Sequence, residues 1–219
     1  MSSRPSSHWA YWGVTQSGKT LELQRRLRTK PRWIVLDYDW DRDRYDALPN
    51  VRTARGVGEL TAEIRRRAQK RPDTWRVSYR ASRPGEYLAA VDAMWALHRT
   101  LDLETTLLVV EEAHRLLEEH QLPEAAKRVI FQGLKRRLVL VTVSQNVQQV
   151  PAQVRHNTDR QVYFRQIGRL PADVRQNLGD SVERVRHLEP LTPAHEARRG
   201  VHYVFHPNHL DDREQWRQI

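Results

Sequence analysis

The feature that most constrains the fold of this chain is the octapeptide Gly13–Thr20, GVTQSGKT. It fits the pattern G-x-x-x-x-G-K-S/T, which requires a strand in front of it and a helix behind it. The apolar and aromatic run His8–Gly13 is typical of a short strand, and leucines recur among charges in Lys19–Arg28, which predicts a helix. The sequence therefore predicts a strand, loop and helix that bind the phosphates of a nucleoside triphosphate.

Each residue type in this loop has a physical task. The glycines let backbone N–H groups curl around the β-phosphate without a Cβ in the way, and the helix N-terminus adds the positive end of its dipole. Lys19 is predicted to reach the β- and γ-phosphates of ATP, and the Thr20 hydroxyl to bind Mg²⁺. The predicted nucleotide-binding residues are Gly13, Thr15, Gln16, Ser17, Gly18, Lys19 and Thr20.

A pair of acidic residues follows a second strand. The run Thr106–Val110, TLLVV, predicts a buried strand, and Glu111 and Glu112 come directly after it. Glu111 is predicted to support Mg²⁺, although Asp is more usual there and Glu is one methylene longer. Glu112 is predicted to activate the attacking water as general base. The alternative is a strand end that runs into an acidic helix start without a catalytic task.

A third buried strand, Leu138–Val143, places a polar side chain beside the same loop. Gln145 follows it, and we expect this carboxamide to sense the γ-phosphate or the attacking water. Further along, the sequence predicts a short helix within residues 150–158 and then a strand that begins near Arg160. The extra glutamate beside the predicted Mg²⁺ ligand favours hydrolysis over transfer to a small acceptor.

The remaining pattern predicts an α/β fold in one domain. Apolar strands alternate with amphipathic helices, which indicates a mostly parallel sheet covered by helices on both faces. We expect a P-loop NTPase domain over residues 8–210, with a polar lead at 1–7 and a polar tail at 211–219. Further strands are predicted at Trp33–Asp37, Thr74–Tyr79, Gln161–Phe164 and Val201–Phe205, and further helices at Val57–Lys70, Glu86–Arg99 and Glu124–Arg136.

The charge of the chain restricts the classes of partner that it can bind. The formal net charge is +10, and 32 of the 37 cationic residues are arginine. Such a balance suits a polyanion, either nucleic acid or an anionic membrane surface, although part of it is ordinary solvated surface. The basic run Arg65–Arg67 is a candidate for DNA-phosphate contact. We expect no transmembrane segment and no signal peptide, because no long apolar run is present. Three histidines, His202, His206 and His209, do not complete a known zinc pattern.

The ordered set of phosphate loop, Glu111 and Glu112, Gln145 and a downstream arginine resembles the FtsK-HerA superfamily of DNA-pumping ATPases. The resemblance covers about residues 8–165 and implies a RecA-like fold of the additional-strand, catalytic-glutamate type. It also implies that Arg160 acts as a finger on a neighbouring subunit's ATP, with Arg155 and Arg165 as rivals.

The size of the chain is similar to that of the minimal genome-packaging ATPases of membrane-containing icosahedral double-stranded DNA viruses. This implies an ATPase ring, a hexamer by resemblance, that contacts double-stranded DNA independently of sequence. Capsid or membrane-vertex proteins are further implied partners, and the host cytoplasm or the packaging vertex of the virion is the implied location. The alternatives are a phage or secretion assembly ATPase that acts on protein, and a small-molecule kinase.

Overall fold

The computed structural model describes residues 7–37, 45–70, 74–80, 83–117 and 122–188, and the backbone of two short strands beyond them. Its centre is a sheet in the order β3-β4-β2-β5-β6-β1-β7-β8-β9. The first seven strands in that order pair in parallel, and β8 and β9 are antiparallel additions at one edge. The strands are β1 Trp9–Trp12, β2 Arg32–Leu36, β3 Val51–Ala54, β4 Trp75–Tyr79, β5 Thr106–Val110, β6 Leu138–Ser144, β7 Arg160–Tyr163, β8 Val204–Phe205 and β9 Trp216–Arg217.

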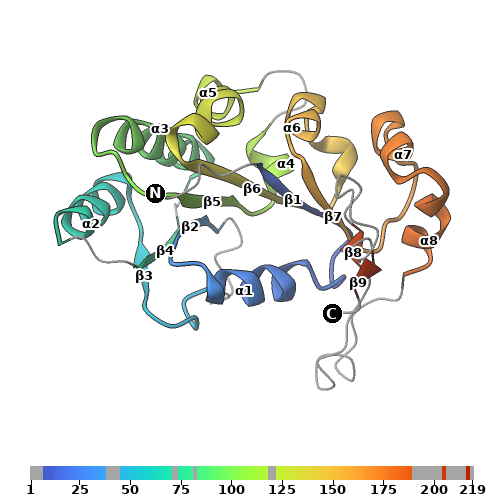
Figure 1. The fold of residues 1–219 in the computed structure, drawn as a ribbon, viewed down its shortest axis with the longest axis horizontal. Helices are drawn as coiled ribbons and strands as arrows, with labels where there is room; N and C mark the ends of the chain where they lie inside the picture. Colours follow the sequence, from blue (N-terminus) through green and yellow to red (C-terminus); the bar gives the residue numbers. More distant parts are fainter. Residues whose placement is uncertain are drawn as a thin grey trace.

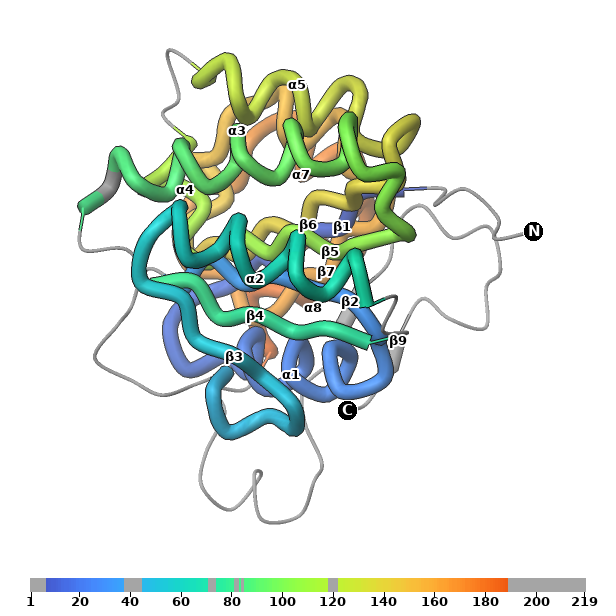
Figure 2. Tube along the Cα trace, turned by 90° about the vertical axis from the view of Figure 1, so that its left-hand side faces the viewer, coloured from blue at the N-terminus to red at the C-terminus, as the bar shows by residue number. Residues whose placement is uncertain are grey.

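Helices cover both faces of this sheet, as the sequence predicts. Figure 1 shows α1 below the sheet and α2, α3, α5 and α6 above it, and the turned view in Figure 2 has the same three layers. The α-helices are α1 Lys19–Thr29, α2 Val57–Lys70, α3 Pro84–Thr100, α4 Ala113–Leu116, α5 Glu124–Gln132, α6 Ala152–His156, α7 Ala172–Leu178 and α8 Val182–Arg186. The expected α/β P-loop NTPase architecture, with a RecA-like strand order, is therefore confirmed.

Two apolar cores lie on opposite faces of the sheet. Successive residues of β5 belong to different cores, because side chains alternate between the two faces of a sheet. Leu108 belongs to the core beneath α2, α3 and α5, whereas Leu107 and Val109 belong to the core beneath α1. Strands β5 and β6 are buried along their whole length, which explains their mostly apolar sequence. The core on the α1 face also receives Tyr45 and Leu48 from the turn before β3.

The strand order brings the candidate site together. Strand β6 lies between β5 and β1, and all three run in parallel, so their carboxyl ends meet at one edge of the sheet. Glu111 and Glu112 follow β5, Gln145 follows β6, and Gly13 follows β1. Ligands of open parallel sheets bind at this edge.

The structure differs from the sequence expectations at several ends. The sequence pattern does not predict strand β3 or helices α7 and α8. Helix α5 ends at Gln132, and a 3-10 turn over Gly133–Arg136 replaces the last part of the expected helix. Strand β9 falls within the segment expected to be a polar tail. In the described part of the chain, no helix is long and apolar enough to cross a membrane. The three histidines discussed above lie outside the described residues.

Candidate functional site

Backbone hydrogen bonds to the end of β6 and to the segment after β7 hold the loop that follows β1. The Gly13 N–H donates to the Ser144 carbonyl at 3.1 Å, and the Val14 N–H donates to the Arg165 carbonyl at 3.0 Å. A Cβ on Gly13 would lie 2.6 Å from the Cβ of Phe164, so this position admits no side chain. Glycine is thus required here by close packing of the loop against β7.

The second glycine and the lysine shape the end of the loop. Gly18 has a φ of +96°, in the left-handed region that favours glycine, and it caps the start of α1. The Lys19 ammonium is buried and donates to the loop's own carbonyls, at 2.6 Å from Gly13 O and 2.9 Å from Val14 O. The ammonium therefore lies inside the curl of the loop.

The two glutamates after β5 face different surroundings. Glu111 is 3% exposed, and its backbone N–H donates to the Leu36 carbonyl at 3.2 Å, which continues the pairing of β5 with β2. Its carboxylate accepts a hydrogen bond from the Tyr45 hydroxyl. Glu112 is 8% exposed and has a φ of +49°, so the chain turns there and begins α4.

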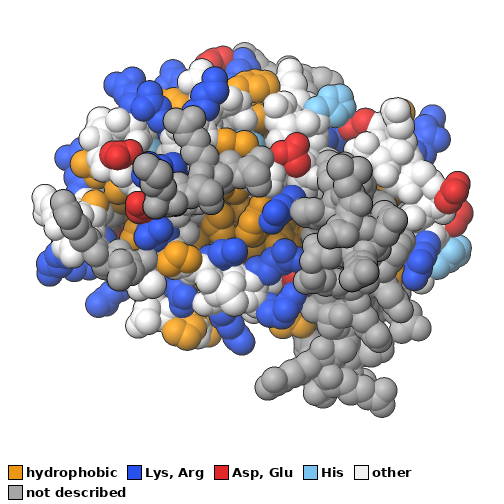
Figure 3. Space-filling view, in the orientation of Figure 1, with side chains coloured by type: hydrophobic (Ala, Val, Ile, Leu, Met, Phe, Trp, Pro, Cys, Tyr) orange, Lys and Arg blue, Asp and Glu red, His pale blue; other side chains and the backbone are white. Residues whose placement is uncertain are grey.

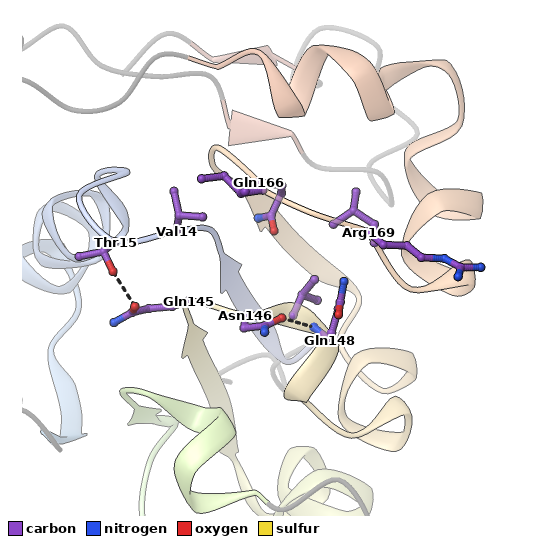
Figure 4. A pocket seen from close by; sticks show the side chains of 10 residues that line it. Val14, Thr15, Gln145, Asn146, Gln148, Gln166 and Arg169 are labelled. Carbon is purple, nitrogen blue, oxygen red and sulfur yellow. Dashed lines mark hydrogen bonds between the residues drawn. The ribbon is translucent and has the colours of Figure 1, made fainter.

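A chain of hydrogen bonds joins Glu112 to the loop. The Gln145 Nε2 donates to the Glu112 Oε1 at 2.6 Å, and the Thr15 hydroxyl donates to the Gln145 Oε1 at 2.6 Å. Figure 4 shows Thr15 and Gln145 turned toward one another from the tips of neighbouring elements. The structure thus brings the predicted water-activating carboxylate, the predicted sensor and the phosphate loop into direct contact.

A histidine lies next to the same carboxylate. The His114 Nδ1 is 3.5 Å from the Glu112 Oε2 and 3.0 Å from the Ser144 hydroxyl oxygen. Burial lowers the pKa of His114 from its ordinary value, and the Glu112 carboxylate opposes this shift. A neutral imidazole that donates from Nδ1 therefore fits this place. No motif in the sequence singles out His114, although it lies only two residues after Glu112.

A polar cavity of about 280 Å³ adjoins the loop. Its lining includes Thr15, Gln145, Asn146, Gln148, Gln166 and Arg169. Figure 4 shows that these side chains come from the tips of β1 and β6 and from the segment after β7. The space beside the loop is thus rich in carboxamides, which donate and accept hydrogen bonds equally well.

The candidate finger Arg160 lies apart from this site. It pairs with Trp9, the first residue of β1, whereas the loop follows the last residue of that strand. Three residue steps along a strand separate the two ends by about 10 Å. The Arg160 guanidinium lies 5.6 Å from the centroid of the Trp9 ring, and the Lys30 ammonium lies 5.5 Å from the same ring. Within one chain, Arg160 does not join the phosphate loop.

The rival arginines have different surroundings. Arg155 is buried and bonds Asp173 through Nε at 2.8 Å and Nη2 at 3.0 Å, and it also bonds the carbonyl of Val147. The Arg155 guanidinium therefore already has hydrogen-bond partners within its own chain. Arg165 is half-buried and lies beside the loop, since its carbonyl accepts from Val14.

The basic run on α2 is partly neutralised. Arg66 and Arg67 both pair with Glu63, at 2.8 and 2.5 Å, whereas Arg65 is exposed. Figure 3 shows Lys and Arg side chains spread over the visible face of the described residues, with acidic groups among them. The positive charge is thus distributed over this face, and α2 contributes only part of it.

The residues at the loop suit a nucleotide and a divalent cation. The buried Ser17 hydroxyl makes no hydrogen bond within the described residues, so it can bond a phosphate oxygen. Thr20 lies in the first turn of α1 and offers a hydroxyl, and Glu111 offers a carboxylate. Such oxygen donors are those that Mg²⁺ prefers. No group of three or more His, Cys, Asp or Glu side chains placed to hold a metal ion occurs in the described ranges.

No protein-family model and no curated protein matches this sequence. Among solved structures, the genome packaging NTPase B204 from Sulfolobus turreted icosahedral virus 2 in complex with AMPPCP is similar, with a TM-score of 0.68, 15% identity, and coverage of 97% of this chain and 96% of that one. The same protein with ATP-gammaS has a TM-score of 0.66 and 14% identity, over 98% and 97% of the two chains. B204, the DNA-packaging ATPase from Sulfolobus turreted icosahedral virus, has a TM-score of 0.65 and 13% identity, over 98% and 97%. This chain has the fold of those NTPases over nearly its whole length.

Proposed function

We propose that this protein is an ATP-hydrolysing translocase that packages double-stranded DNA into a viral capsid. One observation carries the proposal: Thr15, Gln145 and Glu112 form a continuous hydrogen-bond chain at the carboxyl edge of the sheet. This chain connects a phosphate loop to a carboxylate suited to activate water, on a fold that viral packaging NTPases share.

The loop residues have assigned tasks in this proposal. Backbone N–H groups of the loop and the first turn of α1 bind the phosphates, and the glycines at 13 and 18 permit their close approach. The Lys19 ammonium exchanges its bonds to the loop carbonyls for bonds to the β- and γ-phosphate oxygens. Thr15, Gln16 and Ser17 form the rest of the cradle. The adjoining polar cavity leaves room beside the bound phosphates.

The Thr20 hydroxyl and the Glu111 carboxylate would hold Mg²⁺, which neutralises negative charge on the β- and γ-phosphate oxygens when bound. Glu112 accepts a proton from the attacking water, because its carboxylate lies at the loop and is held by Gln145. Gln145 bonds both Glu112 and Thr15, so it can exchange one of these partners for the water or the γ-phosphate. Its role as sensor follows from that position.

The assembly completes the proposal. Residues 8–210 form one ATPase domain of a homo-oligomeric ring, a hexamer by resemblance, in which Arg160 reaches a neighbour's ATP. Double-stranded DNA is bound through its phosphates without regard to sequence, as the basic charge permits. Capsid or membrane-vertex proteins are the further partners, in the host cytoplasm or at the packaging vertex of the virion.

The decisive experiment is the ATPase rate with and without double-stranded DNA over a series of salt concentrations, on protein whose mass is measured in solution. We expect DNA to stimulate the rate and the stimulation to fall steeply with salt, because phosphate contacts release counterions. Activity that DNA leaves unchanged at every salt concentration favours an ATPase acting on protein. Transfer of phosphate to a small acceptor in place of water identifies a kinase.

A further inference from the structure

The two glutamates after β5 are held by different partners. Gln145 bonds Glu112, whereas the hydroxyl of Tyr45 donates to the Oε1 of Glu111. Tyr45 lies in the turn before β3 and is fully buried. The two residues are 66 positions apart in the chain, so this contact is a product of the fold.

Tyr45 approaches Glu111 from the face that α1 covers. Its ring packs in the same apolar core as Leu107 and Val109, which are alternate residues of β5. Because Glu111 still pairs with β2 through its N–H, the alternation of side chains carries it to that face as well. The loop leads into α1 on this face, so Tyr45 and the predicted cation ligands lie on one side of the sheet.

A glutamate in this place requires more restraint than an aspartate. It has one more rotatable bond, and ordering a long side chain costs conformational entropy when the cation binds. A buried carboxylate also requires hydrogen-bond donors in place of water. A phenol hydroxyl supplies both the restraint and the hydrogen-bond donor, because its bond to an ionised carboxylate is strong and directional.

We propose that Tyr45 is a positioning residue for the Mg²⁺ site, fixing the orientation of the Glu111 carboxylate before the cation binds. This inference rests on the proposed ATPase function. Tyr45 touches neither the nucleotide nor the ion, and its effect passes through Glu111. The tyrosine thereby compensates for the additional methylene of glutamate at this position.

The test is the variant Tyr45→Phe, which keeps the ring and removes the hydroxyl. Mn²⁺, as a spectroscopic substitute for Mg²⁺, is titrated by electron paramagnetic resonance against protein saturated with AMPPCP. We expect Mn²⁺ binding to weaken about tenfold, the scale typical when a group that orients a metal ligand is lost. Binding of the nucleotide in the presence of EDTA should be unchanged, since the proposed effect of Tyr45 passes through the cation ligand Glu111.

Tyr163→Phe is the matched control. Tyr163 is also fully buried and also loses its hydroxyl bonding, which includes a bond of 2.6 Å to Gln161, but it packs in the core on the opposite face of the sheet. Its Mn²⁺ affinity should equal that of the wild type. In a Glu111→Gln background, Tyr45→Phe should cause no further loss, because there is no carboxylate left to orient.

Wild-type Mn²⁺ affinity in Tyr45→Phe overturns the inference, and so does an equal loss in Tyr163→Phe. If Tyr45→Phe does not fold, Tyr45→Met replaces it: this side chain fills part of the space of the ring in the core and cannot donate to Glu111, so the same weakening of Mn²⁺ binding is expected and wild-type affinity contradicts the inference. Because the titration requires no turnover, it remains informative if the wild type fails to hydrolyse ATP, a result that would instead refute the proposed function.

Discussion

Gly13 illustrates how one residue links the fold to the phosphate loop. A Cβ added there would lie 2.6 Å from the Phe164 Cβ, 2.9 Å from the Ser17 hydroxyl and 3.2 Å from the Arg165 carbonyl. We therefore expect Gly13→Ala to lower the free energy of unfolding by about 2 kcal/mol, since backbone and core side chains must shift. It should also weaken ATP binding. Urea denaturation and nucleotide titration measure the two effects.

Gly58→Ala is the natural control for that variant. Gly58 lies within α2, and nothing approaches within 4 Å of the position where its Cβ would be. Alanine should stabilise the helix by about 0.5 kcal/mol and leave ATP binding as it was. Equal stability of the two variants would contradict the packing argument for Gly13.

The Glu112 carboxylate gives the sharpest test of chemistry at a single residue. Glu112→Gln keeps the shape and the bond to Gln145 but removes the base, so ATP binding should persist. Turnover should fall by about 10²-fold or more, the usual contribution of a general base. Glu124→Gln, an exposed residue paired with Lys127, should hydrolyse ATP at the wild-type rate. Full turnover by Glu112→Gln would remove Glu112 from the mechanism.

Among the elements, the segment after β6 depends on Arg155 of α6. This guanidinium holds Asp173 of α7 and the Val147 carbonyl, so it ties the turn beside Gln145 to the helices at the sheet edge. We expect Arg155→Ala to cost about 3 kcal/mol in unfolding free energy, because it removes the two arginine bonds of the partly buried Asp173 and the donor to the Val147 carbonyl. Arg186→Ala removes an exposed pair with Glu183 and should cost less than about 1 kcal/mol. Similar losses in the two variants, measured by urea denaturation, would refute this assignment.

A buried histidine of helix α3 bonds the 3-10 turn that precedes β6. His98 Nδ1 lies 2.9 Å from the Arg136 carbonyl, and burial lowers the pKa of His98 to about 4. Between about pH 6.5 and 4 the unfolded chain therefore binds a proton that the folded chain does not, so stability falls as the pH falls. A shift of this size corresponds to about 3 kcal/mol. His98→Gln should flatten the pH dependence of unfolding free energy in this window.

His187→Gln separates this effect from ordinary histidine titration. His187 is exposed, and its nearest acidic partner, Glu183, is exposed as well. Its removal should leave the acid slope of the wild type intact. His8 contributes in the same direction as His98, because burial also lowers the pKa of His8. A wild-type slope in His98→Gln would show that other groups dominate the acid sensitivity.

Some elements can be predicted from the sequence, whereas others are seen only in the structure. Gly13–Thr20 and the run before Glu111 are local patterns whose strands and helix follow from a few neighbouring residues, and the structure has them where the sequence places them. Strand β3 is short and half exposed, so it lacks the apolar run that marked its neighbours. The Tyr45 contact to Glu111 has no local signal, because it depends on how the turn before β3 packs against β5.

At the scale of the whole molecule, the parallel sheet determines which residues lie together at the carboxyl ends of the strands and which lie at the amino ends. The phosphate loop and both glutamates lie at its carboxyl edge, whereas Arg160 lies at the amino end of β7 beside Trp9. An arginine so placed cannot serve its own phosphate loop without a large movement. The proposed trans role thus requires a ring that brings this end of one subunit to the loop of the next.

That requirement leads to a mixing experiment. Arg160→Ala and Lys19→Ala proteins should each be inactive alone, but mixed rings contain intact nucleotide sites that face intact arginines. Activity should therefore return in mixtures, as expected of a finger that contributes about 10³-fold or more in trans. Lys19→Ala mixed with Glu112→Gln is the control, because both changes affect the same site and no complete site can form. If mixed assemblies are detected by mass and Arg160→Ala gains no activity at any ratio, Arg160 is not the finger, and Arg165, which lies beside the loop, becomes the arginine to test.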